Sequence, residues 1–280
     1  MQTGIVKLFL VLLAFHGVAA TNVAAQGTDK RKLQILDLAK MAEQVMKAES
    51  DKYDYSVDIF NDNTASVHLH FLGHAQTTPL HLHHTTEEAT IIVTGKPHVS
   101  QIFGRDGKVE KLEGDYSPGT MIYSPNLCGH KWVNPSKKIM QANLVIASPP
   151  FLGNFYVDPT EPLFKKSRPG LVVRLNEDLQ RWLKVSQSAS QAERLSMLDG
   201  KLLRLYLRKQ VHIPPSSSPT ILYVISGKGL LDAGQSYPLG AQNVALIPPD
   251  HDITLEANMN APMVVIAFRP DVEWEPLTIK

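Results

Sequence analysis

The sequence predicts an all-β fold made of two barrels in tandem, with a few flanking helices. Many short apolar segments follow one another from residue 53 onward with turn residues between them, which favours a barrel or sandwich over alternating strands and helices. The segment ILYVISGKG, which ends at Gly229, resembles TIIVTGK, which ends at Lys96, so the last hundred residues repeat an earlier motif. A chain of 280 residues is also long enough for two small domains.

Residues 1–25 have the pattern of an export signal. Lys7 precedes the apolar run LFLVLLAF, and small residues follow with cleavage options after Ala20 or Ala25. The apolar run is shorter than the about 20 residues that cross a bilayer, so an uncleaved membrane anchor is the less favoured alternative. We therefore expect a periplasmic or secreted protein that has no membrane association after cleavage.

Residues 26–52 form an arm in which the apolar positions predict an amphipathic helix from Asp29 to Ser50. The apolar side chains near helical spacing are Leu33, Leu36, Met41, Val45 and Met46. Such a helix would pack either on a barrel or on a partner subunit, as in a homodimer.

Residues 53–150 form the first predicted barrel. Its expected strands are Tyr55–Phe60, Ser66–Phe71, His81–His84, Ala89–Thr94, Val99–Phe103, Met121–Ser124, His130–Val133 and Met140–Ala147. Residues 151–195 connect the two barrels and contain a second helix near Asn176–Ser186, with Asn176 as its N-cap. Residues 196–280 form the second barrel.

The segment PLHLHHTTEEATIIVTG, residues 79–95, carries the residues of a candidate metal site. His81 and His83 alternate along a strand and therefore share a face. Glu88 returns beside them after a turn, although its neighbour Glu87 is a rival for this role. A fourth candidate ligand, His130, lies in the downstream segment SPGTMIYSPNLCGHKWVN. Imidazole and carboxylate ligands together suit a divalent transition metal.

These segments resemble the paired motifs of the cupin family. The first motif is His-x-His-x4-Glu-x6-Gly, at His81, His83, Glu88 and Gly95, and its spacing to Gly95 favours Glu88 over Glu87. The second motif is Gly119-x5-Pro125-x4-His130-x3-Asn134, in which Leu127 stands where the family has a glycine. The resemblance implies double-stranded β-helix barrels, with a metal bound by the three histidines and the glutamate.

The second barrel repeats the first motif without its metal ligands. When Gly227 is matched to Gly95, the residues at the positions of His81, His83 and Glu88 are Ile213, Pro215 and Thr220, and Ile253 stands at the position of His130. None of these side chains is a useful metal ligand. We expect one metal site, in the N-terminal barrel.

The ligand set does not select among Fe, Mn, Cu, Ni and Zn. Four protein ligands leave open coordination positions, which a catalytic metal needs. The layout most resembles quercetinase-type bicupin dioxygenases, which implies an oxidoreductase acting on a small phenolic or enol substrate, with Glu88 also acting as a base. The alternatives are an isomerase, lyase or decarboxylase acting on a sugar or carboxylate, and a non-catalytic cupin that binds a metal or small ligand.

Strand parity suggests which residues line the pocket. Trp132 and Asn134 share parity with His130, and Thr90 and Ile92 share parity with Glu88, so these four are candidate substrate-binding residues, with core packing as the alternative for Trp132.

Three further residues leave alternatives open. Either face of the segment with His68 and His70 could point into the barrel, and the apolar face is favoured, which would leave both histidines in solvent or at an interface. Cys128 is either a soft ligand or redox thiol or, as we favour, a small residue in a tight turn.

Composition excludes a nucleic-acid-binding role. The formal net charge is +1, and no basic region is present that could hold a polyanion. The expected partner is therefore a small molecule.

Overall fold

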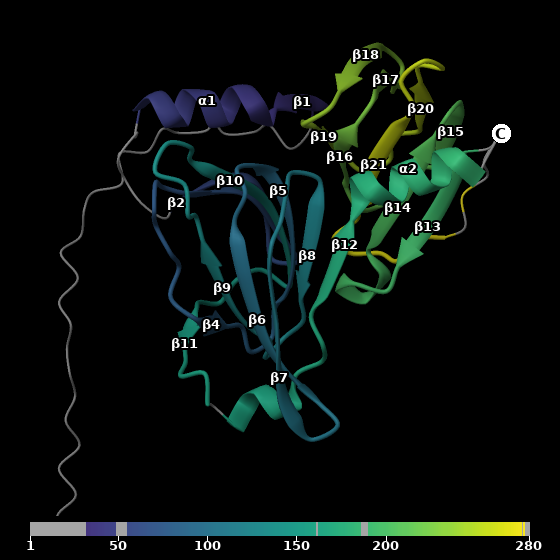
Figure 1. Ribbon diagram of the computed structural model, residues 1–280. Helices are drawn as coiled ribbons and strands as arrows, with labels where there is room; N and C mark the ends of the chain where they lie inside the picture. The colour runs from purple at the N-terminus through teal and green to yellow at the C-terminus, as the bar shows by residue number, and fades with distance from the viewer. Residues whose placement is uncertain (1–31, 49–54, 161, 186–189, 276, 278–280) are drawn as a thin grey trace, which may run out of the picture.

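The computed structural model describes residues 32–48, 55–160, 162–185, 190–275 and 277, so the expected export signal lies outside the described residues. Two β-barrels stand side by side, and helix α1 (Leu38–Ala48) extends across one end of the first barrel (Figure 1). Within the described ranges, no helix has both the length and the apolar character needed to cross a membrane. The chain is all-β in class, as predicted.

The first barrel consists of a six-stranded and a five-stranded sheet. The six-stranded sheet has the order β12–β8–β5–β10–β3–β2, and the five-stranded sheet has the order β11–β4–β9–β6–β7. The strands are β2 (Tyr55–Asn61), β3 (Ser66–Leu72), β4 (His81–Leu82), β5 (Glu87–Thr94), β6 (His98–Arg105), β7 (Lys108–Asp115), β8 (Thr120–Ser124), β9 (Gly129–Val133), β10 (Gln141–Ser148), β11 (Phe155–Tyr156) and β12 (Leu171–Arg174).

The second barrel pairs a six-stranded sheet, β1–β19–β16–β21–β14–β13, with a four-stranded sheet, β15–β20–β17–β18. Its strands are β1 (Gln34–Asp37), β13 (Gln191–Leu195), β14 (Leu202–Leu207), β15 (Gln210–Ile213), β16 (Thr220–Ser226), β17 (Lys228–Asp232), β18 (Ser236–Gly240), β19 (Asn243–Ile247), β20 (Ile253–Ala257) and β21 (Met263–Phe268). The remaining elements are helix α2 (Leu175–Val185) and the short helices η1 (Pro162–Lys166) and η2 (Leu198–Gly200).

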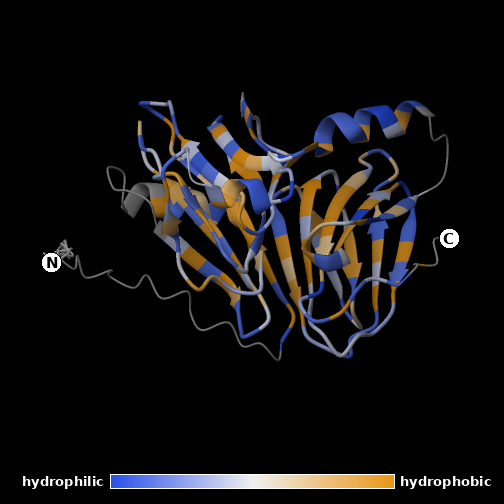
Figure 2. Cartoon of the chain, turned by 90° about the horizontal axis from the view of Figure 1, so that it is seen from below, coloured by the Kyte–Doolittle hydropathy of each residue, from blue (hydrophilic) through white to orange (hydrophobic). Residues whose placement is uncertain are grey.

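The largest apolar core lies between the barrels rather than inside either of them. Outward-facing side chains of β3, β5 and β10 meet those of β14, β16 and β21, for example Leu69 and Phe71 from the first barrel and Tyr223 and Phe268 from the second. In the hydropathy view, hydrophobic positions lie along the strands of both barrels (Figure 2), and apolar residues of both barrels belong to this one core. Burial of this shared surface joins the two barrels into one unit.

The predicted first helix is wrong at its start. Gln34–Asp37 is a strand that pairs with β19 of the second barrel, and the helix begins only at Leu38. Ile35 packs in the core of the second barrel, and the Asp37 carboxylate accepts a hydrogen bond from the backbone N–H of Lys40 at 3.0 Å, which caps the helix. Leu38 and Ala42 are buried in the interbarrel core, so α1 packs on its own chain.

The connecting region contributes strands to both barrels. β12 extends the six-stranded sheet of the first barrel, and β13, which lies before the expected boundary at residue 196, is an edge strand of the second. Helix α2 forms as predicted, but Asn176 lies within its first turn instead of capping it. The Asn176 amide donates a hydrogen bond to the Pro118 carbonyl at 3.2 Å, which ties the helix to the turn before β8.

The eight predicted strands of the first barrel are confirmed with end shifts of one or two residues. β7 was missed because its sequence, KVEKLEGD, is rich in charges and its side chains alternate between half-buried and exposed. That pattern is usual for the solvent-facing edge strand of a sheet.

The expected repeat is visible in the register of the two barrels. His81 on β4 lies opposite His130 on β9, and Ile213 on β15 lies opposite Ile253 on β20 in the same way. Gly95 and Gly227 both have a left-handed backbone, with φ of +84° and +86°. Where the first barrel has its histidines, the second has two fully buried isoleucines in its core.

Replacing Gly227 by alanine should destabilise the chain much more than the same change at Gly234. Both glycines have positive φ, but a Cβ at Gly227 would lie 2.1 Å from the Pro262 carbonyl oxygen, whereas a Cβ at Gly234 would meet nothing within 4 Å. Each variant should lose about 1 kcal/mol of unfolding free energy from the left-handed backbone, and Gly227→Ala should lose about 1–3 kcal/mol more from crowding. Urea unfolding followed by tryptophan fluorescence measures both losses, and equal losses would contradict this account.

Candidate metal centre

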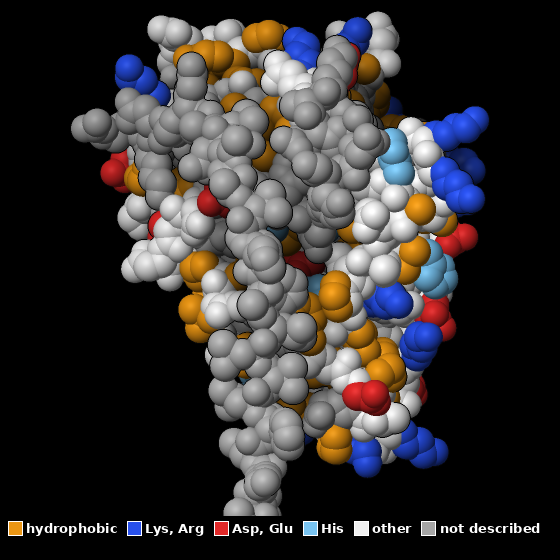
Figure 3. All heavy atoms as spheres, turned by 90° about the vertical axis from the view of Figure 1, so that its left-hand side faces the viewer, with side chains coloured by type: hydrophobic (Ala, Val, Ile, Leu, Met, Phe, Trp, Pro, Cys, Tyr) orange, Lys and Arg blue, Asp and Glu red, His pale blue; other side chains and the backbone are white. Residues whose placement is uncertain are grey.

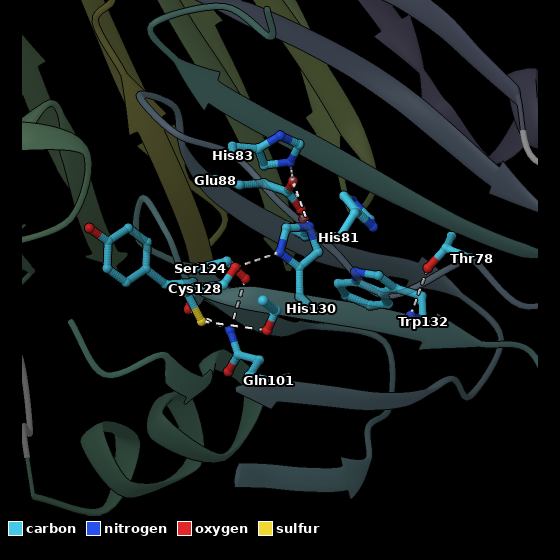
Figure 4. A network of polar contacts seen from close by, with 12 residues as sticks. Thr78, His81, His83, Glu88, Gln101, Ser124, Cys128, His130 and Trp132 are labelled. Atoms are coloured by element: carbon cyan, nitrogen blue, oxygen red, sulfur yellow. Dashed lines mark hydrogen bonds and ion pairs between the residues drawn. The ribbon is translucent and has the colours of Figure 1, made fainter. Parts of the chain in front are cut away.

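Three histidines from two neighbouring strands converge on one point inside the first barrel. His81 lies on β4, His83 directly follows that strand, and His130 lies on the paired strand β9 (Figure 4). One ring nitrogen of each histidine lies within 4.8 Å of the others, and all three residues are buried. In the part of the chain that the structure describes, these residues form the one group of three or more side chains suited to holding a metal ion.

Hydrogen bonds to backbone carbonyls fix the orientation of all three rings. The Nδ1 atoms of His81, His83 and His130 contact the carbonyl oxygens of Pro79, Gly153 and Cys128 at 2.9, 3.2 and 3.3 Å. A nitrogen that donates to a carbonyl carries the proton, which leaves the lone pair on Nε2. Each ring is thus held in the tautomer that a metal ligand requires.

Glu88 lies beside two of the three histidines. Its Oε2 atom is 3.5 Å from Nε2 of His83 and 3.5 Å from Nε2 of His130. The other carboxylate oxygen, Oε1, accepts a hydrogen bond from the Thr90 hydroxyl. The carboxylate of Glu88, which the motif spacing favours over that of Glu87, is therefore directed toward the histidine cluster.

The donor set fits a divalent transition metal. Nε2 of His83 is buried and has no hydrogen-bond partner, although the Glu88 carboxylate is close to it. A buried polar atom without a partner is costly unless it binds something. Three imidazole nitrogens with one adjacent carboxylate satisfy an ion of the Fe, Mn, Cu, Ni or Zn type.

The electrostatics of the cluster centre on Glu88. Burial alone would raise the pKa of Glu88, but the charge and hydrogen bond of His130, together with His83, hold that pKa well below its usual value. Burial alone would lower the pKa of His130, yet the carboxylate of Glu88 raises it. Burial and the nearby His130 lower the pKa of His81 to about 3. Glu88 is thus ionised and His81 neutral near pH 7.

The cluster opens into a cavity of about 370 Å³. This volume lies at the small end of the range for ligand pockets. In a side view, histidine and acidic side chains are visible between the surrounding residues (Figure 3). The cavity is lined by Ser56, Asp58, Asn61, Ser66, His68, His70, Thr78, His81, His83, Glu88, Thr90, His130, Trp132, Val145, Pro150, Phe151 and Asn154.

Two of the four predicted pocket residues line this cavity, namely Thr90 and Trp132. Ile92 does not, because it packs with Leu72 and Trp132 in a small apolar cluster. Asn134 does not line it either. Its amide donates to three carbonyls, including those of Gly73 and Ile139 at 2.9 Å, and thereby holds the chain between β9 and β10. We therefore assign both residues to structural roles.

The favoured orientation of the strand with His68 and His70 was wrong. Both histidines line the cavity, whereas Val67, Leu69 and Phe71 face outward into the interbarrel core. The apolar face is buried as expected, but against the second barrel instead of inside the first. Burial and the neighbouring His70 lower the pKa of His68 to about 4, so its ring is neutral near pH 7.

The segment after β10 supplies residues that the sequence did not single out. Phe151 lies with its ring centroid 4.6 Å from that of His83, and the Gly153 carbonyl orients the same histidine. Phe155 and Tyr156, on β11, lie beside His84 and His81. The sequence pattern places these aromatic residues in the predicted connection between the barrels, residues 151–195.

Glu87 faces away from the histidines and has a different set of partners. Its carboxylate accepts hydrogen bonds from the Tyr123 hydroxyl at 2.6 Å and from the backbone N–H of Leu198 at 3.1 Å, and it pairs with Arg168. Leu198 belongs to η2, next to the second barrel. Strand alternation thus directs Glu88 to the cavity and Glu87 to the junction between the barrels.

The turn before His130 is built without the usual glycine. Leu127 has a φ of +62°, and its backbone N–H donates to the His83 carbonyl at 2.8 Å. The equivalent position of the second barrel, Asp250, also has a positive φ of 61°. Burial raises the pKa of the neighbouring Cys128 thiol to about 12, which keeps it protonated and favours a packing role over metal binding.

The fold and the site together define a two-barrel protein with one candidate metal centre, and solved structures share this architecture. No protein-family model matches the sequence, and no curated protein resembles it at a significant level. A salicylate 1,2-dioxygenase from Pseudaminobacter salicylatoxidans superposes with a TM-score of 0.60 over 86% of this chain and 85% of that one, at 12% identity. Its adduct with gentisate gives a TM-score of 0.59 at 15% identity, over 86% of this chain and 81% of that one.

A cupin 2 conserved barrel domain protein from Leptotrichia buccalis gives a TM-score of 0.60 at 9% identity, over 84% of this chain and 96% of that one. At such identities the likeness concerns the fold. The chain has the cupin fold in its two-barrel form, as the motifs predicted.

Replacing His83 by alanine should abolish stoichiometric metal binding. Loss of one imidazole removes a ligand that the fold holds in place through Gly153. The matched control is His84→Ala, because His84 is adjacent but exposed. Elemental analysis after dialysis measures the metal in both variants. A full metal content in His83→Ala, or an equal loss in both variants, would contradict the assignment.

Glu87→Ala should lower the free energy of unfolding by about 3 kcal/mol, because two buried donors lose their acceptor, without changing the metal content. The change leaves the Tyr123 hydroxyl and the Leu198 N–H without their acceptor at the junction between the barrels. Glu88→Ala should instead reduce metal binding, and Glu256→Ala, on an exposed site, should change neither quantity. Urea unfolding and elemental analysis of the three variants separate the roles of the adjacent glutamates. Metal loss in Glu87→Ala would reverse the assignment.

Proposed function

We propose that the protein is an exported, metal-dependent oxidoreductase that acts as a dioxygenase on a small phenolic or enol substrate. One observation carries this proposal: an ionised, buried carboxylate lies between two of three converging histidines at the wall of a small cavity. The export pattern of residues 1–25 supports a periplasmic or secreted location, and the low net charge of +1 supports a small-molecule partner.

A divalent metal bound by His81, His83 and His130 would supply Lewis acidity toward a substrate hydroxyl and a redox centre for reaction with O2. The three rings contribute fixed positions for their Nε2 atoms, because each Nδ1 is hydrogen-bonded to the backbone. Reaction at such a centre requires little rearrangement of the protein.

Glu88 is the residue suited to accept the proton of a substrate hydroxyl. Its low pKa keeps it ionised, and Thr90 holds Oε1, so Oε2 remains directed at the cluster where the hydroxyl would lie. A carboxylate of low pKa is a weak base, but it suffices for a hydroxyl whose own pKa is lowered by a neighbouring cation.

The cavity wall also suits a planar substrate. Trp132, Phe151 and Val145 provide apolar and aromatic surface close to the histidines. Flat rings pack favourably against such surfaces. The structural neighbours named for salicylate and gentisate give further support, because both compounds are small phenols.

Oxygen consumption by the metal-loaded protein tests this proposal. We expect consumption with flavonols or related enol-bearing phenolics, loss of activity in His130→Ala, and a decrease of about 10²-fold or more per bound metal in Glu88→Gln, the scale of general-base catalysis. His84→Ala serves as the control. Turnover of a substrate without O2 would point instead to an isomerase, lyase or decarboxylase. Metal binding without turnover of phenolics, sugars or carboxylates would indicate a binding protein.

A further inference from the structure

A row of cavity-facing side chains crosses the six-stranded sheet away from the metal centre. Thr90 on β5 lies opposite Val145 on β10, Val145 lies opposite His68 on β3, and His68 lies opposite Asp58 on β2. All four side chains line the cavity. Adjacent strands are about 4.8 Å apart, so His68 stands roughly 10 Å from Thr90 along the row. The two ends of the row are polar, and Val145 separates them.

Phe151 covers the space between these ends. Its ring centroid lies 4.6 Å from that of the metal-centre residue His83 and 5.4 Å from that of His68. One aromatic side chain thus contacts both polar regions of the cavity. Together with Val145 it forms an apolar stretch of the length of a planar ring system.

The far end of the row is equipped for hydrogen bonding to a hydroxyl group. Within the described residues, the His68 ring makes no hydrogen bond, and a neutral imidazole offers one donor and one acceptor. The Asp58 carboxylate accepts a hydrogen bond from the Asn61 amide at 3.3 Å and retains further acceptor capacity. The described residues that line the cavity include no lysine or arginine. A substrate carboxylate at this end would meet a like charge, whereas a hydroxyl can donate to Asp58.

We propose that His68 and Asp58 form a second polar subsite, which binds a hydroxyl group at the far end of a planar substrate whose other oxygen lies at the metal centre. The substrate is therefore an uncharged ring compound with oxygen at both ends and has no carboxylate at the far end. This inference rests on the proposed function only for the identity of the metal centre as the first subsite.

Anaerobic calorimetry with the metal-loaded protein tests the subsite without requiring turnover. The probes are two pairs of compounds, and in each pair one compound has one hydroxyl and the other has two. The shorter pair is phenol and hydroquinone, and the longer pair is para-phenylphenol and para,para-biphenol. A fifth probe, para-hydroxybenzoate, has a carboxylate at the far end. In at least one pair, the compound with two hydroxyls should bind about fivefold to tenfold more tightly than its partner, the gain of a hydrogen bond to an acceptor that is partly open to solvent. It should also bind more tightly than para-hydroxybenzoate.

Two variants test whether the preference for the compound with two hydroxyls arises at His68 and Asp58. His68→Phe and Asp58→Ala should each remove it while leaving the metal content and the affinity for the single-hydroxyl probe unchanged. His251→Phe, at an exposed site of the second barrel, should preserve it. Absence of the preference in the wild-type protein, or its persistence in both subsite variants, would overturn the proposal. Absence of oxygen consumption would overturn only the proposed function, because these affinities are measured without O2.

Discussion

The face-to-face packing of the two six-stranded sheets is the constraint on which the rest of the structure depends. A sheet must bury at least one apolar face, and here β3, β5 and β10 bury theirs against β14, β16 and β21. The opposite face of the first sheet then no longer has to provide the main core. That face carries His68, Glu88 and Thr90, and it forms one wall of a polar cavity.

The metal centre follows from this arrangement and from a single strand pair. β4 and β9 place His81 opposite His130, and the chain after β4 adds His83. β5 brings Glu88 to the same point while its alternation sends Glu87 to the barrel junction. In the second barrel the equivalent strands, β15 and β20, carry Ile213 and Ile253. Their side chains belong to the apolar core of that barrel.

The sequence predicted what depends on local spacing. It predicted the positions of the histidines, the direction of Glu88 and the absence of metal ligands in the repeated motif before Gly227. Each of these depends on neighbours within one hairpin or one strand pair. It did not predict what depends on distant contacts. Gln34–Asp37 is a strand because β19 offers it an edge, and His68 faces inward because the second barrel covers the other side of its strand. Asn134 shares parity with His130, yet three carbonyls of nearby loops hold its amide.

The position of strand β1 has a consequence for how this protein can vary. β1, from the N-terminal arm, completes a sheet of the second barrel, and β12, which follows the first barrel, completes one of its sheets. Neither barrel can be expressed alone without exposing the apolar face that it buries against the other barrel. The second barrel thus has a structural role that does not depend on any chemistry of its own. Its loops can change sequence freely only where they leave the shared face undisturbed.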